Sequence, residues 1–133
     1  MRELRPPAAS GLEGIASVVQ RLAVLLAAGV TPATAWGHLA EEADAGVLGS
    51  VADAAASGQP VSEALLAFVD AVGADSGAGE QAWRGLAAAW QVATEAGASL
   101  APSLRQFASS LRDLAQTRRD LSVALAGPVA TAR

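Results

Sequence analysis

Side chains that could carry out chemistry are few and scattered in this chain of 133 residues. His38 is the only histidine, and there is no cysteine. A metal site built from several His and Cys ligands therefore cannot be assembled, and no cysteine nucleophile exists. The Gly-x-Ser-x-Gly elbow of serine hydrolases and the glycine-rich loops that bind phosphates are also missing from the sequence. We expect His38 to be a partly exposed helix histidine.

Carboxylates are the remaining catalytic candidates. An enzyme of unfamiliar type could use Glu41, Glu80 or Glu95, but no spacing typical of an acid–base pair links them. The sequence therefore predicts that the protein is not an enzyme and that it uses no cofactor.

One acidic group, Glu41, Glu42 and Asp44, lies near the end of the second predicted helix, where the helix dipole disfavours anions. Such a group is usually a solvated face. The alternatives are a docking patch for a basic partner, or an oxygen site for a hard cation such as calcium. The spacing does not match an EF-hand loop, so a cation site would need several helices. We predict no resident metal.

The net charge of −4 conceals an asymmetry along the chain. Residues 1–99 hold four arginines against eleven carboxylates, which gives −7, whereas residues 100–133 hold five arginines against two aspartates, which gives +3. An acidic body argues against binding to a phosphate backbone, so we expect no nucleic-acid partner. A basic end would suit a segment beside a membrane.

Apolar periodicity predicts helices and no convincing strand. An uncharged stretch runs from Leu22 to Ala40, yet it contains Gly29 as a helix-ending residue, then Thr31 as an N-cap and Pro32 at the first helical position. This stretch is therefore predicted to be the elbow of a helical hairpin and not a membrane span. Helices are predicted at residues 12–28, over a second segment that begins at Pro32, at 47–56, at 61–72, over a fifth segment ending at Gly97, and at 99–126. The fold class is thus all-α: a compact antiparallel bundle of about six helices built from helical hairpins, with a long C-terminal helix.

The elbow pattern recurs twice. Gly58 is followed by Ser62 as a plausible N-cap, and Gly97 is followed by Ser99. Aligning Gly29 with Gly97 favours two related hairpins about 68 positions apart. Residues 73–80 form the most flexible-looking loop of the body.

The last predicted helix carries a heptad rhythm in which Arg118 occupies the one seam position without an apolar residue. The apolar positions are Leu100, Leu104, Phe107, Leu111, Leu114, Leu121 and Leu125. This spacing predicts coiled-coil-like packing against another helix of the chain or against a second copy. Arg118 is either a solvated residue at the rim of the seam or the point where the helix leaves its bundle. The tryptophans, each in an apolar stripe, are predicted to be core anchors: Trp36, Trp83 and Trp90.

Three stretches together resemble the type II secretion F domain. They are LAVLLAAGVTPATAWGHLAE at residues 22–41, GQPVSEAL at 58–65, and the last third from residue 83 to 133, which is most similar to the TadB/TadC proteins of tight-adherence (Flp-type) pilus systems. In that family, a segment similar to AGPVATAR at residues 126–133 leads into a transmembrane helix. The resemblance covers roughly residues 15–133.

The resemblance implies the cytoplasmic domain of an inner-membrane platform protein under a pilus or a type II secretion machine. Such a protein couples the assembly ATPase to the movement of pilin or pseudopilin subunits, and it contacts other inner-membrane platform components. It would have no catalytic chemistry of its own. Localisation at the cytoplasmic face of the inner (plasma) membrane is implied, and we also expect a homo-oligomer.

The predicted domain organisation has three parts. Residues 1–11 are a flexible lead-in, residues 12–126 are the helical domain, and residues 127–133 are a juxtamembrane segment before a transmembrane helix that the sequence does not contain. The partner-binding surface is expected on the acidic second helix and on the exposed side of the last helix, at Glu41, Glu42, Asp44, Arg112, Arg118 and Arg119. An alternative is a soluble homodimeric helical adaptor or regulatory bundle, which the sequence downstream of Arg133 would distinguish.

Overall fold

The computed structural model describes residues 11–42, 46–72, 77–97 and 99–131. These residues form six helices and no strand, which confirms the all-α prediction. The helices are α1 (Leu12–Ala27), α2 (Pro32–Glu42), α3 (Val47–Ala56), α4 (Val61–Val72), α5 (Ala78–Ala96) and α6 (Leu100–Thr131).

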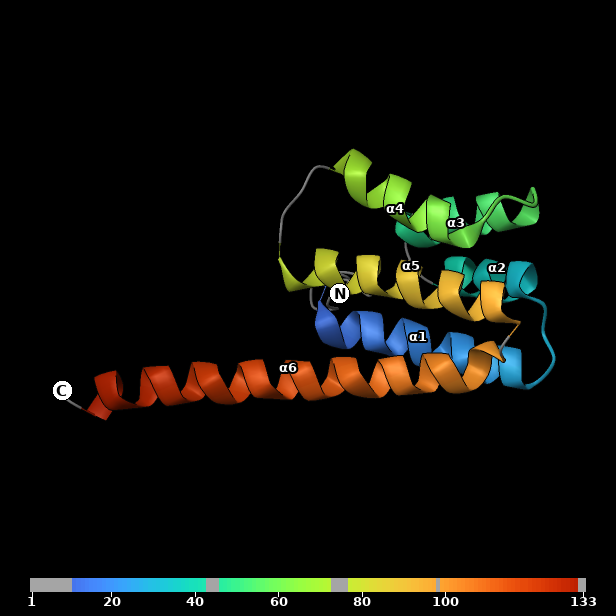
Figure 1. Ribbon diagram of the computed structural model, residues 1–133. Helices are drawn as coiled ribbons and strands as arrows, with labels where there is room; N and C mark the ends of the chain where they lie inside the picture. The colour runs from blue at the N-terminus through green and yellow to red at the C-terminus, as the bar shows by residue number, and fades with distance from the viewer. Residues whose placement is uncertain (1–10, 43–45, 73–76, 98, 132–133) are drawn as a thin grey trace.

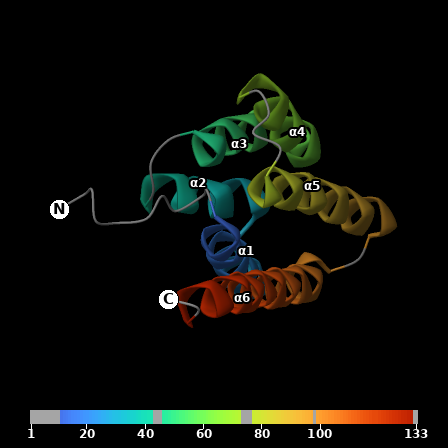
Figure 2. The ribbon, with the colours of Figure 1, turned by 90° about the vertical axis from the view of Figure 1, so that its left-hand side faces the viewer.

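Successive helices run in opposite directions, so the bundle is antiparallel (Figure 1). α3 and α4 form an outer layer over α2 and α5, and α6 lies on the opposite side of the bundle, where it contacts both α1 and α5 (Figures 1 and 2). The most extensive contact is between α1 and α6, followed by those of α2 with α3 and of α4 with α5. The elbows α1–α2, α3–α4 and α5–α6 all lie at one end of the bundle, because each pair of helices returns there (Figure 1).

The first elbow is a Schellman motif. Gly29 has φ +97°, a left-handed conformation that glycine adopts without a Cβ penalty. The N–H of Val30 donates to the carbonyl of Leu25 (3.0 Å), and the N–H of Gly29 donates to that of Leu26 (3.0 Å). These two bonds satisfy carbonyls in the last turn of α1, where the helix itself provides too few N–H donors.

The restart of the chain as α2 also follows the prediction. The side-chain oxygen of Thr31 accepts the N–H of Thr34 (3.4 Å), while the carbonyl of Thr31 accepts the N–H of Ala35 (2.8 Å). Pro32 takes the first helical position, where its missing N–H costs nothing. The uncharged stretch is therefore a helical hairpin. No helix of the described residues is long and apolar enough to cross a bilayer.

The other two elbows also end a helix with a glycine, but one prediction about them is wrong. Gly58 (φ +82°) and Gly97 (φ +71°) are both left-handed, as the repeated pattern predicts. Ser62, however, is not the N-cap of α4: the helix begins at Val61, and Ser62 is buried in its first turn with 6 % of its surface exposed. Pro60 holds the cap position, and its carbonyl accepts the N–H of Ala64 (3.2 Å).

The core confirms the tryptophan prediction, since Trp36, Trp83 and Trp90 are all buried. The largest side chains with essentially no exposure come from all six helices: Trp36, Ile15, Leu22, Leu48, Leu65, Leu86 and Leu104. Small alanines and the three large tryptophans belong to one cluster of buried side chains.

The prediction of a loop over residues 73–80 is partly wrong. α5 already begins at Ala78, and Glu80 lies in its first turn, where the helix dipole favours a carboxylate. Residues 73–76 lie outside the described residues, as do residues 1–10 of the predicted lead-in. The one described residue of that lead-in, Gly11, is the N-cap of α1.

The last helix differs from prediction in length and in the face that it buries. It continues to Thr131 instead of ending at Ala126. Of the predicted seam, Leu104 and Leu111 are buried, but Leu114, Leu121 and Leu125 are exposed. The buried stripe is formed by Ala101, Leu104, Ala108, Leu111 and Ala115. The small alanines let α6 approach α1 closely, a role that a search for large apolar residues overlooks.

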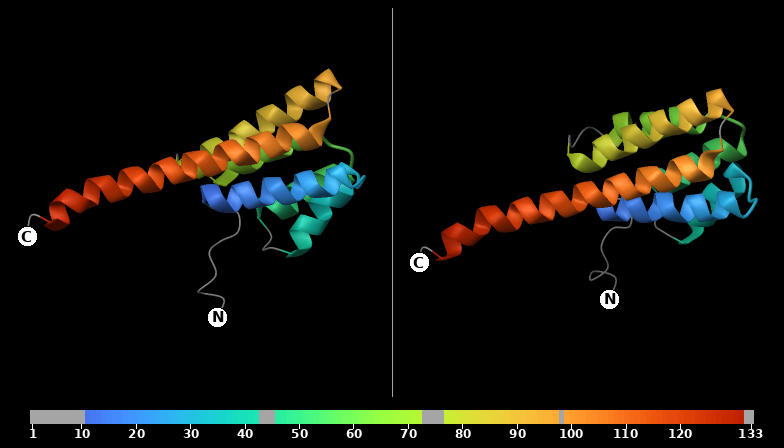
Figure 3. Two further views of the ribbon diagram at one scale, coloured as in Figure 1. Left: turned by 90° about the horizontal axis from the view of Figure 1, so that it is seen from below. Right: turned by 60° about the horizontal axis from the view of Figure 1, so that its bottom comes forward.

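Beyond Ala115 the helix leaves the bundle. Every side chain described from Gln116 to Ala126 is exposed, and Figure 3 shows this part of α6 projecting past all the other helices. We call Gln116–Ala126 the α6 extension. Arg118 is exposed and lies three residues beyond Ala115, so both predicted roles, a solvated residue and a position near the departure point, are compatible with its place.

Candidate functional site

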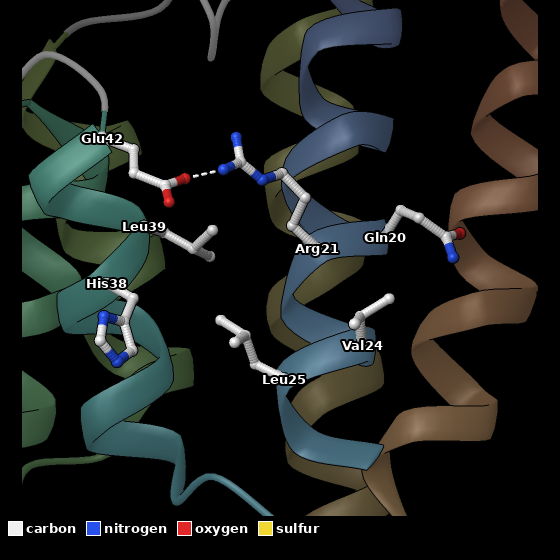
Figure 4. A pocket seen from close by; sticks show the side chains of 7 residues that line it. All are labelled: Gln20, Arg21, Val24, Leu25, His38, Leu39 and Glu42. Carbon is white, nitrogen blue, oxygen red and sulfur yellow. Dashed lines mark ion pairs between the residues drawn. The ribbon is translucent and has the colours of Figure 1, made fainter. Parts of the chain in front are cut away.

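A groove between α1 and α2 is the first candidate site, and we call it the α1–α2 groove. It has a volume of about 330 Å³ and is lined by Gln20, Arg21, Val24, Leu25, His38, Leu39 and Glu42. Leu25 and Leu39 extend toward each other from the two helices and form an apolar floor (Figure 4). His38 stands on the α2 wall and Val24 on the far side of α1, both exposed to solvent.

An ion pair closes one end of the α1–α2 groove. Arg21 on α1 binds the carboxylate of Glu42 on α2, and both side chains are about half exposed (Figure 4). Surface pairs of this kind contribute little stability, about 0–1 kcal/mol. Their charges therefore remain available to a partner that approaches the groove. The walls offer a cation, a carboxylate and an imidazole around an apolar floor, which suits protein recognition.

The predicted acidic cluster is divided by this ion pair. Glu42 is engaged with Arg21, whereas Glu41 is exposed at the end of α2. Asp44 lies outside the described residues. Among the residues that the structure places, no group of three or more His, Asp or Glu side chains is arranged to hold a metal ion. The calcium alternative therefore gains no support from the described part of this cluster.

Glu80 and Glu95, the other carboxylates considered for catalysis, lie near opposite ends of α5. At 1.5 Å per residue they are separated by roughly 22 Å, too far to act as one acid–base pair. Glu95 accepts a hydrogen bond from the amide of Gln91 (2.8 Å).

Glu80 instead belongs to a charged clamp between α4 and α5. Its Oε2 accepts from Nε of Arg84 (3.1 Å), and Nη2 of Arg84 donates to Asp70 on α4 (2.8 Å). Hydrogen bonding to Asp70 first, and then to Glu80, raises the pKa of the Arg84 guanidinium above its ordinary value. The clamp fixes the packing of two helices, so we assign it a structural role.

The predicted basic residues all lie on α6 and are exposed. Arg112 and Arg118 are exposed, and Arg119 forms an ion pair with Glu13 in the first turn of α1. This pair joins residues 106 positions apart and lies just beyond Ala115, where α6 departs. The acidic and basic candidate residues thus lie on different helices, with α1 between α2 and α6 (Figure 1).

A second groove, at the elbow end of the bundle, was missed by sequence reasoning. This elbow groove has a volume of about 540 Å³, with Trp90 and Leu100 in its wall and the carboxylates of Glu63 and Glu95 beside them. Pro32 and Pro60, the residues at the starts of α2 and α4, also line it. The signal in the sequence was the repeated glycine elbow: alternating helices bring all three elbows to one end.

Comparison with known protein families identifies the family of this chain. Residues 18–133 match the family model described as type II secretion system (T2SS), protein F. The comparison with curated proteins and the comparison with solved structures each gave no match.

Proposed function

The chain belongs to the type II secretion system protein F family, and from this we propose that it is the cytoplasmic domain of a platform protein at the inner membrane. Its partners would be the assembly ATPase, the pilin or pseudopilin subunits and other platform components. The machine would be a tight-adherence (Flp-type) pilus system of the TadB/TadC kind or a type II secretion system. The observation that carries the proposal is the family match over residues 18–133.

The geometry supports a role in protein contacts. The described carboxylates form no acid–base pair along α5, while two grooves with apolar walls and charged rims lie on the surface. A domain that binds two partners needs two separate surfaces. The exposed end of α2, with Glu41, and the outer face of α6, with Arg112 and Arg118, provide surfaces of opposite charge.

We assign the ATPase contact to the acidic end of α2, because Glu41 is exposed and precedes Glu42, which lines the α1–α2 groove. The test is a pull-down of the purified assembly ATPase of the same system with the full chain. Glu41→Arg should weaken capture, because a rim charge of the wrong sign repels a basic partner. Asp53→Arg on α3 is the matched control, since Asp53 is also an exposed helix carboxylate.

Equal capture by wild type and by Glu41→Arg would remove α2 from the contact. Failure of the ATPase to bind the wild-type chain at all would count against the platform function itself. A soluble homodimeric adaptor would then become the leading function, because that role requires no ATPase.

A further inference from the structure

Two carboxylates on the wall of the elbow groove have no cationic partner. Glu63 lies in the first turn of α4 and Glu95 in the last turn of α5, and both side chains are exposed. Neither forms an ion pair within the part of the chain that the structure describes, and no arginine or histidine is among the described residues that line the groove. The hydrogen bond from Gln91 to Glu95 leaves the charge of this carboxylate in place. The groove therefore presents negative charge only, which favours a ligand with positive charge.

The N-terminus of α4 adds unpaired hydrogen-bond donors to the same groove. Pro60 stands at the cap position and has no side-chain oxygen that could accept a hydrogen bond. The first N–H that pairs at this end of the helix is that of Ala64, which donates to the carbonyl of Pro60. The N–H groups of Val61, Ser62 and Glu63 have no acceptor among the described residues. All three residues line the groove, so their donors are available to the carbonyl oxygens of a ligand.

A buried hydroxyl beside these donors is an independent sign of a ligand. Ser62 lines the groove with only 6 % of its surface exposed. Its hydroxyl forms no hydrogen bond with any described residue, although leaving a buried polar group unpaired is unfavourable. A carbonyl oxygen of a bound peptide would supply the missing acceptor.

The remaining wall of the elbow groove is largely apolar. Trp90 and Leu100 come from α5 and from the start of α6, and Val61 comes from α4. The volume of about 540 Å³ lies within the range of pockets that enclose a ligand. An apolar side chain next to a basic one would thus find a surface to pack against.

We propose that the elbow groove binds a basic, extended segment of a partner protein. Backbone carbonyls of the segment accept hydrogen bonds from the start of α4 and from Ser62. Its arginine or lysine side chains pair with Glu63 and Glu95, and a neighbouring apolar side chain packs against Trp90. The same two carboxylates repel nucleic acid and other polyanions.

This groove is separate from the surface that we assign to the ATPase. α2 begins at the elbow end with Pro32, which lines the elbow groove, whereas Glu41 lies at the other end of α2 (Figure 1). The proposal does not depend on the platform function, because it rests only on the charges and the unpaired donors of the groove.

The first test titrates a basic peptide into the full chain labelled with ¹⁵N. The probe is a capped hexapeptide in which arginine and leucine alternate, and the comparison peptide carries glutamate in place of each arginine. The amide signals of Val61, Ser62 and Glu63 should move with the basic peptide, at a dissociation constant between about 10 µM and about 1 mM. The acidic peptide should leave these signals unchanged.

Neutralising the two carboxylates tests the role of charge. The double variant Glu63→Gln with Glu95→Gln should bind the basic peptide about tenfold more weakly. The matched control is Glu41→Gln with Asp120→Asn, which removes the same charge from two exposed carboxylates outside the groove. This control should bind the peptide as the wild type does.

Ser62→Ala tests the buried hydroxyl. It should weaken binding of the basic peptide at least about threefold, while the unfolding midpoint of the free chain should not fall, because the hydroxyl has no partner among the described residues to lose. Ser109→Ala, at an exposed position of α6, should change neither quantity.

Absence of binding up to about 1 mM peptide, or equal binding of the basic and acidic peptides, would overturn the proposal. So would an equal loss in the two double variants, since net charge alone would then explain it. Signals that move only around His38 and Leu39 would place the peptide in the α1–α2 groove instead. A lower unfolding midpoint of Ser62→Ala with unchanged peptide affinity would make Ser62 a structural residue and remove it from the site.

Discussion

The indole rings of Trp36 and Trp90 lie with their centroids 5.7 Å apart and their planes tilted by 55°, and they join α2 to α5. The backbones of these two helices do not come into close contact. Alanine side chains could not fill such a gap, so the pair of large rings takes the place of direct helix packing. This explains why a chain so rich in alanine places tryptophans in the centre of its core.

Trp36→Ala should lower the free energy of unfolding by about 3–5 kcal/mol, because it leaves a large cavity between α2 and α5. Trp36→Phe should cost clearly less. It keeps an aromatic ring against Trp90, and the indole nitrogen of Trp36 has no hydrogen-bond partner among the described residues. Denaturant unfolding followed by circular dichroism measures both. Val92→Ala is the control on α5: with 65 % of Val92 exposed, a change within about 0.5 kcal/mol is expected. An equal loss for Phe and Ala at position 36 would contradict this account.

Gly29→Ala should destabilise the protein by about 1–2 kcal/mol. A Cβ at this position would meet no atom within 4 Å, so the cost comes only from the left-handed backbone at φ +97°. Gly37→Ala is the matched control, because Gly37 also has open space around it but lies within α2 with ordinary helical backbone. That change should stabilise the protein by about 0.4–1 kcal/mol. Thermal unfolding of the two variants checks the opposite signs, and equal signs would refute the elbow geometry.

Gly85→Leu should destabilise the contact between α5 and α6. Even a Cβ at residue 85 would lie 3.3 Å from the ring of Phe107, so a larger side chain must push the helices apart, at a cost of about 1–3 kcal/mol. Gly37→Leu, which meets no neighbour at its Cβ, should have little effect. A stable Gly85→Leu protein with unchanged tryptophan fluorescence would argue against the close approach of the two helices.

Replacing Arg84 with Gln should lower the denaturation midpoint slightly, and the loss should shrink in high salt because the groups are exposed. The pH dependence follows from the raised pKa of Arg84. A group whose pKa is raised on folding contributes its full stabilisation below the unfolded pKa and loses it only as the pH rises through the folded value. This part of the effect should therefore be constant through neutral and moderately alkaline pH. If the wild type and the Arg84→Gln variant became equally stable near neutral pH, this account of the clamp would be contradicted.

Amide hydrogen exchange should divide α6 at Ala115. In dilute solution, amides from Ala101 to Ala115 should be protected by packing on α1, while those of the α6 extension should exchange much faster. Mass spectrometry of peptic fragments measures the difference. Uniform protection along the whole helix in a monomeric sample would mean that the extension packs on its own bundle.

Much of this fold could be predicted from the sequence because its signals are local. Gly29, Thr31 and Pro32 specify an elbow through backbone preferences that need no tertiary contact. The predicted ranges of α3 and α4 agree with the structure, and burial of the tryptophans follows from their apolar stripes. Ser62 shows the limit of such signals, since α4 begins one residue before it, at Val61.

Other features depended on which helices meet, and only the tertiary structure decided them. The heptad spacing of α6 showed that one face of this helix is apolar. The stripe that it buries, however, includes the alanines at 101, 108 and 115, because small side chains allow α6 and α1 to approach closely. The binding of Glu42 by Arg21 and the separation of Glu80 from Glu95 likewise follow from helix placement. Cap chemistry and periodicity act within a few residues along the chain and therefore determine the helices. Packing joins residues as distant as Glu13 and Arg119, and it alone decides where α6 leaves the bundle and exposes its leucines.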